Sequence, residues 1–555
     1  MSSGSADAAA AHRDNLRREV EACLAAVQAF RSQSSHTACA VDLAEAEQDG
    51  SRRCDALFAA LMGERTQAAL DGPAVRETAH TLARKAPKRL KAAGERQVCV
   101  QFQRGSSVPL RTTYYRRRQG DARHREKGLF PAFAVLGIHE HASPAAAAQM
   151  ARSACAVASL EEAAAWLRDT GGLAVDIKTL RRVTRRFGKR ARCALPGNLQ
   201  TLQVGGEGRS VVVSVDGGRV RVRRDKAGAR TPKGRRRYHT DWREPLLLHI
   251  YVLGPDGRLD RTFTPLIDGT LGGADALFDM LRLYLPLFNA LQPSRVLLIA
   301  DGAPWIWKRF TALIEQGAIA CPHPVIQLID FYHAVEHLGT FAEACTFWPR
   351  ARRTRWRNHA RQLLRAGKIE TVLNEMQTLL GRRPRSDALK KDRHYFLRNR
   401  HRFSYAWARR LHLPIGSGPM ESAIRRVINL RLKGPGIFWH EETAEAMLMI
   451  RSYYKAQRGN ELAQLACAAP TGLSHPLFDF DAQQPIGRGK TTGPGIENTL
   501  AIGHGPLKNR FPSQLFAMVS VWSLHSRPRP TGCQAIYGPY HLRARADLND
   551  LSLDE

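Results

Sequence analysis

Residues 296–307, with the sequence VLLIADGAPWIW, decide the fold of this chain: five apolar residues run into Asp301 and then into Gly-Ala-Pro. An uninterrupted apolar run with two β-branched members predicts a strand that is buried on both faces and ends in a loop. Asp301 is therefore expected at the carboxyl end of a strand, where ligands bind in open α/β sheets.

Two further apolar runs end in the same way. Residues 211–218 read VVVSVDGG and residues 325–330 read VIQLID, so that Asp216 and Asp330 also follow predicted strands. Because aspartate suits turns, a turn role explains any one of the three equally well. Three such ends in one region favour a shared acidic site.

Positive charge dominates the composition. The 555 residues include 84 Lys and Arg against 51 Asp and Glu, a formal net charge of +33. Such an excess favours a polyanionic partner, and nucleic acid comes first. The length allows two to four domains with a substantial core.

The sequence gives no sign of a membrane or of export. No apolar run approaches the roughly 18–20 residues of a membrane span, and the start has no basic segment followed by an apolar one. Ten cysteines lie scattered without a C-x-x-C pair. This pattern is typical of a reducing cytoplasm and indicates neither a disulfide framework nor a zinc ribbon.

The first two regions are expected to be mainly helical. Residues 1–125 contain helices, a hairpin at 98–115 and then Arg116–Arg118, which either hold phosphates or merely solvate a loop. Residues 126–195 predict a helix-turn-helix DNA-binding domain with helices from Pro144, from Ser159 and from about Asp176. The basic side chains of the third helix are the expected DNA contacts, namely Lys178, Arg181, Arg182, Arg185, Arg186 and Lys189. The alternative is an ordinary solvated basic face.

The expected fold class is α/β: an RNase H-like mixed sheet with helices on both faces, interrupted by an α-helical insertion. Strands at 211–216, 246–252, 261–266, 296–300 and 325–330, with helices at 274–291 and 305–316, place the first part of the catalytic domain at 205–335. The insertion covers 336–408. It is rich in arginine around Trp348 and Trp356, which suits either nucleic acid or a packed core.

The last part of the catalytic domain is expected at 409–460. There Glu421 falls in the first turn of a helix that follows a glycine-rich loop, where a carboxylate is also favoured by the helix dipole alone. A second helix follows from Glu441. Residues 461–555 have lost periodicity, and we predict a largely disordered tail.

Asp216, Asp301 and Glu421 are the expected metal ligands. Hard divalent cations prefer carboxylate oxygens, and two ions about 3.5–4 Å apart stabilise both the attacking and the leaving oxygen of a phosphodiester. The expected cofactor is therefore a pair of Mg²⁺ or Mn²⁺ ions.

Three boxes in this order carry a resemblance to a known family. They are ADGAPWI at 300–306, DFYHAVEHL at 330–338 and IGSGPMESA at 415–423, the last followed by RLKGPGIFW at 431–439. Over residues 130–455 the chain resembles the bacterial DDE insertion-sequence transposases of the ISKra and ISLre kind. By position, Asp216, Asp301 and Glu421 match the family's catalytic acids, while Asp330 and His333 match its D-x-x-H box.

The resemblance implies metal-dependent cleavage of double-stranded DNA at transposon ends and transfer of the 3′-hydroxyl into target DNA. It also implies a homodimer or higher oligomer on DNA in a bacterial cytoplasm, associated with the nucleoid.

Four basic residues follow Glu421 and are expected either along the cleaved strand or on a solvated helix: Arg425, Arg426, Arg431 and Lys433. Trp305 and Trp307 either stack on a flipped base or pack in the core. The paired cysteines that many relatives carry are missing.

Two alternatives stay open. A catalytically inactive or domesticated DNA-binding protein would keep the fold without chemistry, and a stand-alone metal-dependent nuclease would cut without joining. The sequence does not separate these from a transposase.

Overall fold

The computed structural model describes residues 3–33, 39–86, 90–117, 129–232, 234, 236–382, 387–434 and 436–468. They belong to one compact unit, residues 1–482. Three parts of the sequence lie outside the described residues: Arg118, the arginines Arg383 and Arg385 of the predicted insertion, and the tail from 469. None of the described helices combines the length and apolar composition needed to cross a bilayer.

A mixed five-stranded sheet lies at the centre of the sequence, as expected for an α/β protein. Its order is β7-β6-β3-β8-β9. Strands β7, β6 and β3 pair antiparallel, whereas β3, β8 and β9 run parallel. The strand bounds are β3 Ser210–Gly217, β6 Leu246–Val252, β7 Leu266–Thr270, β8 Arg295–Ala300 and β9 Ile326–Ile329.

One predicted strand is wrong. Residues 261–265 are not a strand, and β7 begins only at Leu266. The carboxylate of Asp260 accepts hydrogen bonds from the backbone N–H of Thr262 at 2.9 Å and from its hydroxyl at 2.6 Å, which bends the chain. Pro265 then offers no N–H for a ladder.

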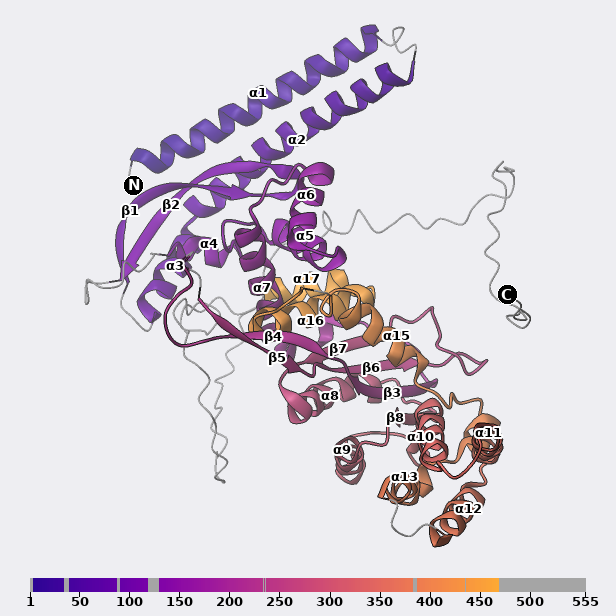
Figure 1. Ribbon diagram of the computed structural model, residues 1–555. Coiled ribbons are helices and arrows are strands. Elements are labelled where there is room, and N and C mark those ends of the chain that lie inside the picture. The colour runs from indigo at the N-terminus through magenta and orange to yellow at the C-terminus, as the bar shows by residue number, and fades with distance from the viewer. Residues whose placement is uncertain are drawn as a thin grey trace, which may run out of the picture. The chain divides into compact units, whose positions relative to one another are not determined.

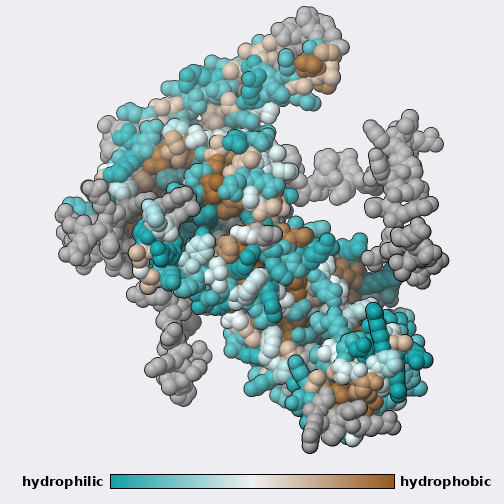
Figure 2. Space-filling model, in the orientation of Figure 1, coloured by the Kyte–Doolittle hydropathy of each residue, from teal (hydrophilic) through white to brown (hydrophobic). Residues whose placement is uncertain are grey.

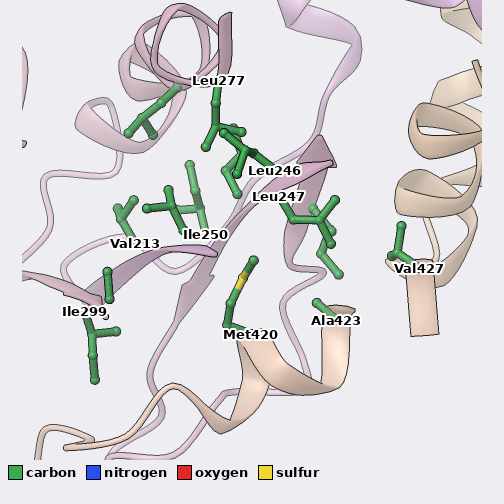
Figure 3. Packing of buried hydrophobic residues seen from close by; sticks show 14 of the residues in the cluster. Val213, Leu246, Leu247, Ile250, Leu277, Ile299, Met420, Ala423 and Val427 are labelled. Carbon is green, nitrogen blue, oxygen red and sulfur yellow. The ribbon is translucent and has the colours of Figure 1, made fainter. Parts of the chain in front are cut away.

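Helices cover both faces of the sheet. Leu277 of α8 (Gly273–Asn289) approaches one face, while Met420 and Ala423 of α15 (Gly418–Ile424) approach the other (Figure 3). All three side chains are buried. The remaining helices of this part are α9 (Pro304–Glu315), η5 (Arg425–Asn429), α16 (Glu441–Lys455) and α17 (Gly459–Ala468).

The buried side chain of Arg451 holds η5 in place. η5 is a π-helical turn, whose wide spacing frees backbone carbonyls. Arg451 on α16 donates to the carbonyl of Val427 at 2.6 Å and to the carbonyls of Arg426 and Cys155. One guanidinium therefore ties η5 to the end of α5.

Helices α5 (Pro144–Ala156), α6 (Leu160–Gly171) and α7 (Ile177–Ala194) form at the expected positions. Ser143 caps α5 at the N–H of Ala146. Ser159 caps α6, although Glu162 reaches the N–H of Ala158 instead of closing a reciprocal box. Buried side chains of all three helices belong to the same core as the sheet.

A buried ion pair connects α7 to the sheet. Arg192 contacts both carboxylate oxygens of Asp268 on β7, at 2.5 and 2.7 Å, and the hydroxyl of Tyr284 on α8 donates to the same carboxylate at 2.6 Å. Asp268 is fully buried. The basic helices and the sheet therefore form one packed body rather than two separate cores.

The predicted insertion is helical. It contains α10 (Phe331–Ala344), α11 (Arg350–Arg365), α12 (Ile369–Arg382), α13 (Asp387–Arg398) and α14 (Tyr405–Arg410). Trp356 packs between two other aromatic rings. Its ring centroid lies 5.1 Å from that of Phe341 and 6.2 Å from that of Trp348. Trp348 is buried and Trp356 donates to Glu375, so the core interpretation of both indoles is the one observed.

The amino-terminal part has its own small core. Helices α1 (Ser3–Gln33) and α2 (Ala40–Asp71) lie side by side (Figure 1), and a long hairpin of β1 (Leu90–Gln101) and β2 (Ser107–Arg117) packs on α2. The buried Gln67 of α2 exchanges two hydrogen bonds with the backbone of Arg111. Helices α3 (Pro73–Lys85) and α4 (Pro131–Val135) complete this part.

The tail begins later than expected. Residues 461–468 belong to α17, whose Leu462, Leu465 and Ala466 are buried. The apolar i, i+3, i+4 spacing of these side chains explains why the segment is helical. The short helical turns η1 (Gln103–Gly105), η2 (Leu195–Gly197), η3 (Leu199–Thr201) and η4 (Arg400–Arg402) account for the remaining helical residues described.

Candidate active site and nucleic-acid interface

Asp216, Asp301 and Asp330 stand at the same level on three adjacent parallel strands. Val215 pairs with Ala300, and Ala300 with Ile329. The next residue of each strand is one of the three aspartates. Because neighbours in register on adjacent strands point to the same side, the strands deliver three carboxyl groups to one edge of the sheet.

Helix α15 covers the same side of the sheet as Asp216. Ser214 is two residues before Asp216, shares its face, and is paired with His249 on β6. The carbonyl of Pro419, in the first turn of α15, lies against this buried His249. The helix that carries Glu421 therefore lies over the face that presents Asp216.

The charge of Asp216 is poorly compensated. The pKa of its carboxyl is raised to about 6, chiefly by burial and in addition by the negative charges of Asp301 and Asp330. The N–H of Gly217, which donates at 2.7 Å, and the nearby His333 act in the opposite direction. A partly desolvated carboxylate next to like charges is the kind of site that a cation or a proton stabilises.

Asp301 is half-buried and organised by its own loop. Its carboxylate accepts the N–H of Ala303 at 3.0 Å, and its carbonyl accepts the indole N–H of Trp307 at 2.6 Å. Trp307 is buried and lies under the guanidinium of Arg402. Of the two alternatives for Trp307, stacking on a flipped base or packing in the core, the structure shows packing, because the buried ring holds the loop of Asp301. Trp305 is half-buried and packs against Phe278.

Asp330 connects the start of α10 to the loop that precedes α15. It is fully buried, and its carboxylate accepts the N–H of His333 at 2.8 Å and the N–H of Ser417. The first bond caps α10, and the second holds the glycine-rich loop that leads into α15. His333 keeps its ring partly exposed, 3.4 Å from Glu336.

Glu421 is exposed on α15. Its neighbours Met420 and Ala423 point into the sheet (Figure 3), so the glutamate lies on the other side of the helix. Across the described part of the chain, no three His, Cys, Asp or Glu side chains form a group that could hold a metal ion. The structure thus brings Asp216 and Asp301 together, whereas Glu421 is an exposed side chain of α15.

Sequence reasoning missed Tyr395 on α13, which packs directly over Gly302. Its hydroxyl is buried and has no hydrogen-bond partner among the residues that the structure describes. Burial raises the pKa of Tyr395, and the charges of Asp301 and Asp330 raise it further. His337 stacks on the tyrosine ring at 3.7 Å and contacts Asp392 at 2.9 Å. A long sequence separation hid this group, since only folding brings α13 to the strand end.

The basic helix α7 exposes part of its predicted interface. Lys178 and Arg181 are exposed, and Arg185 pairs with Glu442 at 3.3 Å. Arg182 and Arg186 both face Glu140, at 3.3 and 3.5 Å. The positive charge available to a partner is therefore greatest at the amino-terminal end of α7.

The basic residues near Glu421 also differ in how far they are exposed to solvent. Arg425 and Lys433 are exposed, and Arg426 is half-buried. Arg431 is buried, donates to the carbonyl of Ala154 and lies over the ring of Trp439. The guanidinium of Arg431 joins the chain that follows η5 to α5 and is not on the surface in this structure, and its contact with DNA stays a prediction.

The insertion adds a further basic surface. The arginines Arg365, Arg409 and Arg410 line a hollow of about 360 Å³ where α11 and α14 meet. The face of the molecule drawn in Figure 2 is mainly hydrophilic, with apolar residues in scattered patches.

Comparison with known proteins gives no assignment: no protein-family model matches the sequence, and no curated protein matches it significantly.

Proposed function

We propose that this protein is a DDE transposase, which cleaves DNA at transposon ends and transfers the 3′-hydroxyl into target DNA. The observation that carries the proposal is the alignment of Asp216, Asp301 and Asp330 at the ends of three parallel strands. The raised pKa of Asp216 supports it, because uncompensated carboxylates attract cations.

The strand order supports the same proposal. Three antiparallel strands followed by two parallel ones, in the order β7-β6-β3-β8-β9, is the order of an RNase H-like sheet. The first aspartate then falls on the central strand and the second on its parallel neighbour. In the proposal, α5 to α7 serve as the helix-turn-helix DNA-binding region, and the protein acts as a homodimer or higher oligomer on paired ends.

Asp216 and Asp301 would hold one divalent cation, Mg²⁺ or Mn²⁺, between them. When bound, such ions activate water or a 3′-hydroxyl and stabilise the departing oxygen of a phosphodiester. The carboxylates act as ligands and not as proton carriers. Glu421 completes the set only if α15 or its side chain approaches the strand ends when DNA is bound.

Asp330 has a different part in the proposal. Its buried carboxylate fixes the start of α15 through Ser417 and the start of α10 through His333. It therefore positions the glutamate-bearing helix relative to the strand that carries Asp301.

A strand-transfer assay tests the proposal. The full chain is incubated with labelled DNA from both flanks of its coding region, a target plasmid, and Mg²⁺ or Mn²⁺. We expect cleaved ends and joined products, both abolished in Asp216→Asn and Asp301→Asn but not in the control Asp279→Asn, an exposed carboxylate on α8. Joining by Asp301→Asn at the wild-type rate contradicts the site.

One observation favours a second candidate, a DNA-binding protein without catalysis. Glu421 is exposed, and the described residues contain no group of three acidic, histidine or cysteine side chains that could hold a metal ion. Binding to the flanking DNA without cleavage in either metal identifies this candidate. Cleavage without joined products identifies a nuclease instead.

A further inference from the structure

A two-stranded ribbon projects from the sheet directly beside Asp216. It consists of β4 (Val220–Asp225) and β5 (Tyr238–Arg243), which lie next to α16 in Figure 1. The ribbon leaves the sheet after Gly217 at the end of β3 and returns to it at Leu246, where β6 begins. The N–H of Gly218 donates to the carbonyl of Pro245 at 2.9 Å and closes its base.

One face of the ribbon carries arginines opposite aromatic residues. Arg221 pairs in register with Trp242, Arg223 with Thr240, and Asp225 with Tyr238. The side chain of Trp242 is 57% exposed and that of Tyr238 46%. Large aromatic rings this exposed are costly unless a partner covers them.

The arginines lie over the rings rather than away from them. The guanidinium carbon of Arg221 is 4.7 Å from the ring centre of Phe438 and 5.6 Å from that of Trp242, while Arg223 is 5.6 Å from Tyr238. Phe438 and Tyr238 are 6.1 Å apart. Planar cations and aromatic rings thus alternate on a continuous surface, which we name the ribbon face: Arg221, Arg223, Tyr238, Trp242 and Phe438.

The ribbon face is held in place at one edge. The N–H of Arg223 donates to the carbonyl of Trp439 at 2.9 Å, and the N–H of Trp439 donates to the carbonyl of Arg221 at 3.0 Å. Trp439 is itself buried. A surface fixed by backbone hydrogen bonds loses little conformational entropy when a partner binds.

Charge identifies the class of partner. Residues 219–243 contain eleven Lys and Arg against two Asp. Asp225, which lies opposite Tyr238 on the ribbon, forms an ion pair with Arg236 at 3.1 Å. An apolar protein partner has no need of this charge, whereas a nucleic acid supplies both phosphates for the cations and flat bases for the rings.

We propose that the ribbon face binds unpaired DNA next to Asp216, with bases stacked on Trp242 and Tyr238 and phosphates held by the neighbouring cations. Unpaired bases fit better than a duplex, because bases in a duplex already cover one another's faces while exposed rings gain most from free ones. This inference rests on the proposed function for the identity of the DNA: a strand opened at the cleavage site is where unpaired bases arise.

Binding of labelled oligothymidylate tests the inference. The full chain is titrated by fluorescence anisotropy in EDTA against a single strand of about 20 nucleotides and a duplex of the same length. Stacking is worth about 1–3 kcal/mol per base. We therefore expect the double variant Trp242→Ala/Tyr238→Ala to lose about tenfold or more in affinity for the single strand, with less than a twofold change for the duplex.

Two controls define the result. Leu24→Ala removes an apolar side chain that is 60% exposed on α1, outside the regions proposed to bind DNA, and is expected to bind both probes as the wild type does. Lys226→Gln/Arg230→Gln removes two exposed charges of the ribbon and is expected to weaken both probes and to flatten the salt dependence. Unchanged single-strand affinity in the aromatic variant, or an equal loss for the duplex, overturns the inference.

The inference and the proposed function fail separately. Binding in EDTA needs no metal chemistry, so it is expected to persist in Asp301→Asn. An Asp301→Asn protein that binds the single strand normally but joins no ends supports both. If the wild type joins ends and Trp242→Ala/Tyr238→Ala binds the single strand with wild-type affinity, the inference is contradicted and the proposed function is not.

Discussion

Asp216 and Asp301 are register neighbours, each one residue beyond the paired Val215 and Ala300 of two parallel strands. Two carboxylates in this arrangement repel each other, and the pKa of Asp216 is raised to about 6 by burial first and by its acidic neighbours second. The cost of holding these charges together in the absence of a cation is measurable.

Asp216→Asn is expected to stabilise the metal-free protein above neutral pH. A carboxyl whose folded pKa is raised stabilises the fold when protonated, and this contribution is lost as the pH rises through about 6. The asparagine amide stays uncharged and avoids this loss. We therefore expect the free energy of unfolding to rise by on the order of 1–3 kcal/mol, since one pKa unit corresponds to about 1.4 kcal/mol.

Urea unfolding in EDTA at pH 8 and at pH 5 measures this effect. The gain in unfolding free energy is expected to be larger at pH 8 than at pH 5, whereas Asp279→Asn on α8 is expected to show no such pH dependence. A destabilised Asp216→Asn protein at pH 8 contradicts the electrostatic account.

Tyr395→Phe is expected to separate chemistry from stability. The buried hydroxyl has no partner in the described structure, so its removal leaves the unfolding free energy unchanged or raises it by about 1 kcal/mol. If this hydroxyl donates to the reacting phosphate beside Asp301, cleavage slows about tenfold at unchanged DNA affinity. Wild-type single-turnover cleavage rates in Tyr395→Phe leave the residue a packing role only.

Arg451→Met is expected to cost about 3–5 kcal/mol of unfolding free energy. The methionine fills similar volume but leaves the carbonyls of Val427, Arg426 and Cys155 without their donor, and each unsatisfied buried group costs about 1–3 kcal/mol. The matched control is Arg282→Met, which truncates an exposed guanidinium on α8 and is expected to cost less than about 1 kcal/mol. Equal losses in both variants would show that the π-turn does not depend on this side chain.

Local signals in the sequence predicted much of the sheet and part of the site. Apolar runs that end in aspartate gave β3, β8 and β9 and placed Asp216 and Asp301 at one edge, because strand periodicity and parallel pairing are set by neighbouring residues. Serine caps and proline gave the starts of α5 and α6 for the same reason.

Long-range partners decided what the sequence did not predict. The role of Asp330 depends on Ser417, 87 residues away, and that of Arg431 on Ala154, 277 residues away. Nothing local distinguishes a buried arginine from an exposed one on a basic helix. The ribbon face escaped prediction because β5 is exposed on both sides and therefore lacks the apolar alternation of a strand that covers a core.

Lys178→Gln/Arg181→Gln is expected to weaken duplex binding through charge alone. Both side chains are exposed at the start of α7, and neither takes part in the contacts of Arg182 and Arg186 with Glu140. Each phosphate contact contributes about 0.9 to the slope of log affinity against log salt. The double variant is therefore expected to reduce this slope by nearly two while the unfolding free energy stays within about 0.5 kcal/mol of the wild type.

Arg186→Gln is the matched comparison on the same helix. Its guanidinium is mostly buried and faces Glu140, so its loss is expected to lower stability more than it lowers the salt slope. Titration of a labelled duplex over a series of salt concentrations gives both slopes. A slope unchanged in Lys178→Gln/Arg181→Gln means that α7 presents a solvated face, and the duplex must then be held by the arginines of the insertion or of the ribbon.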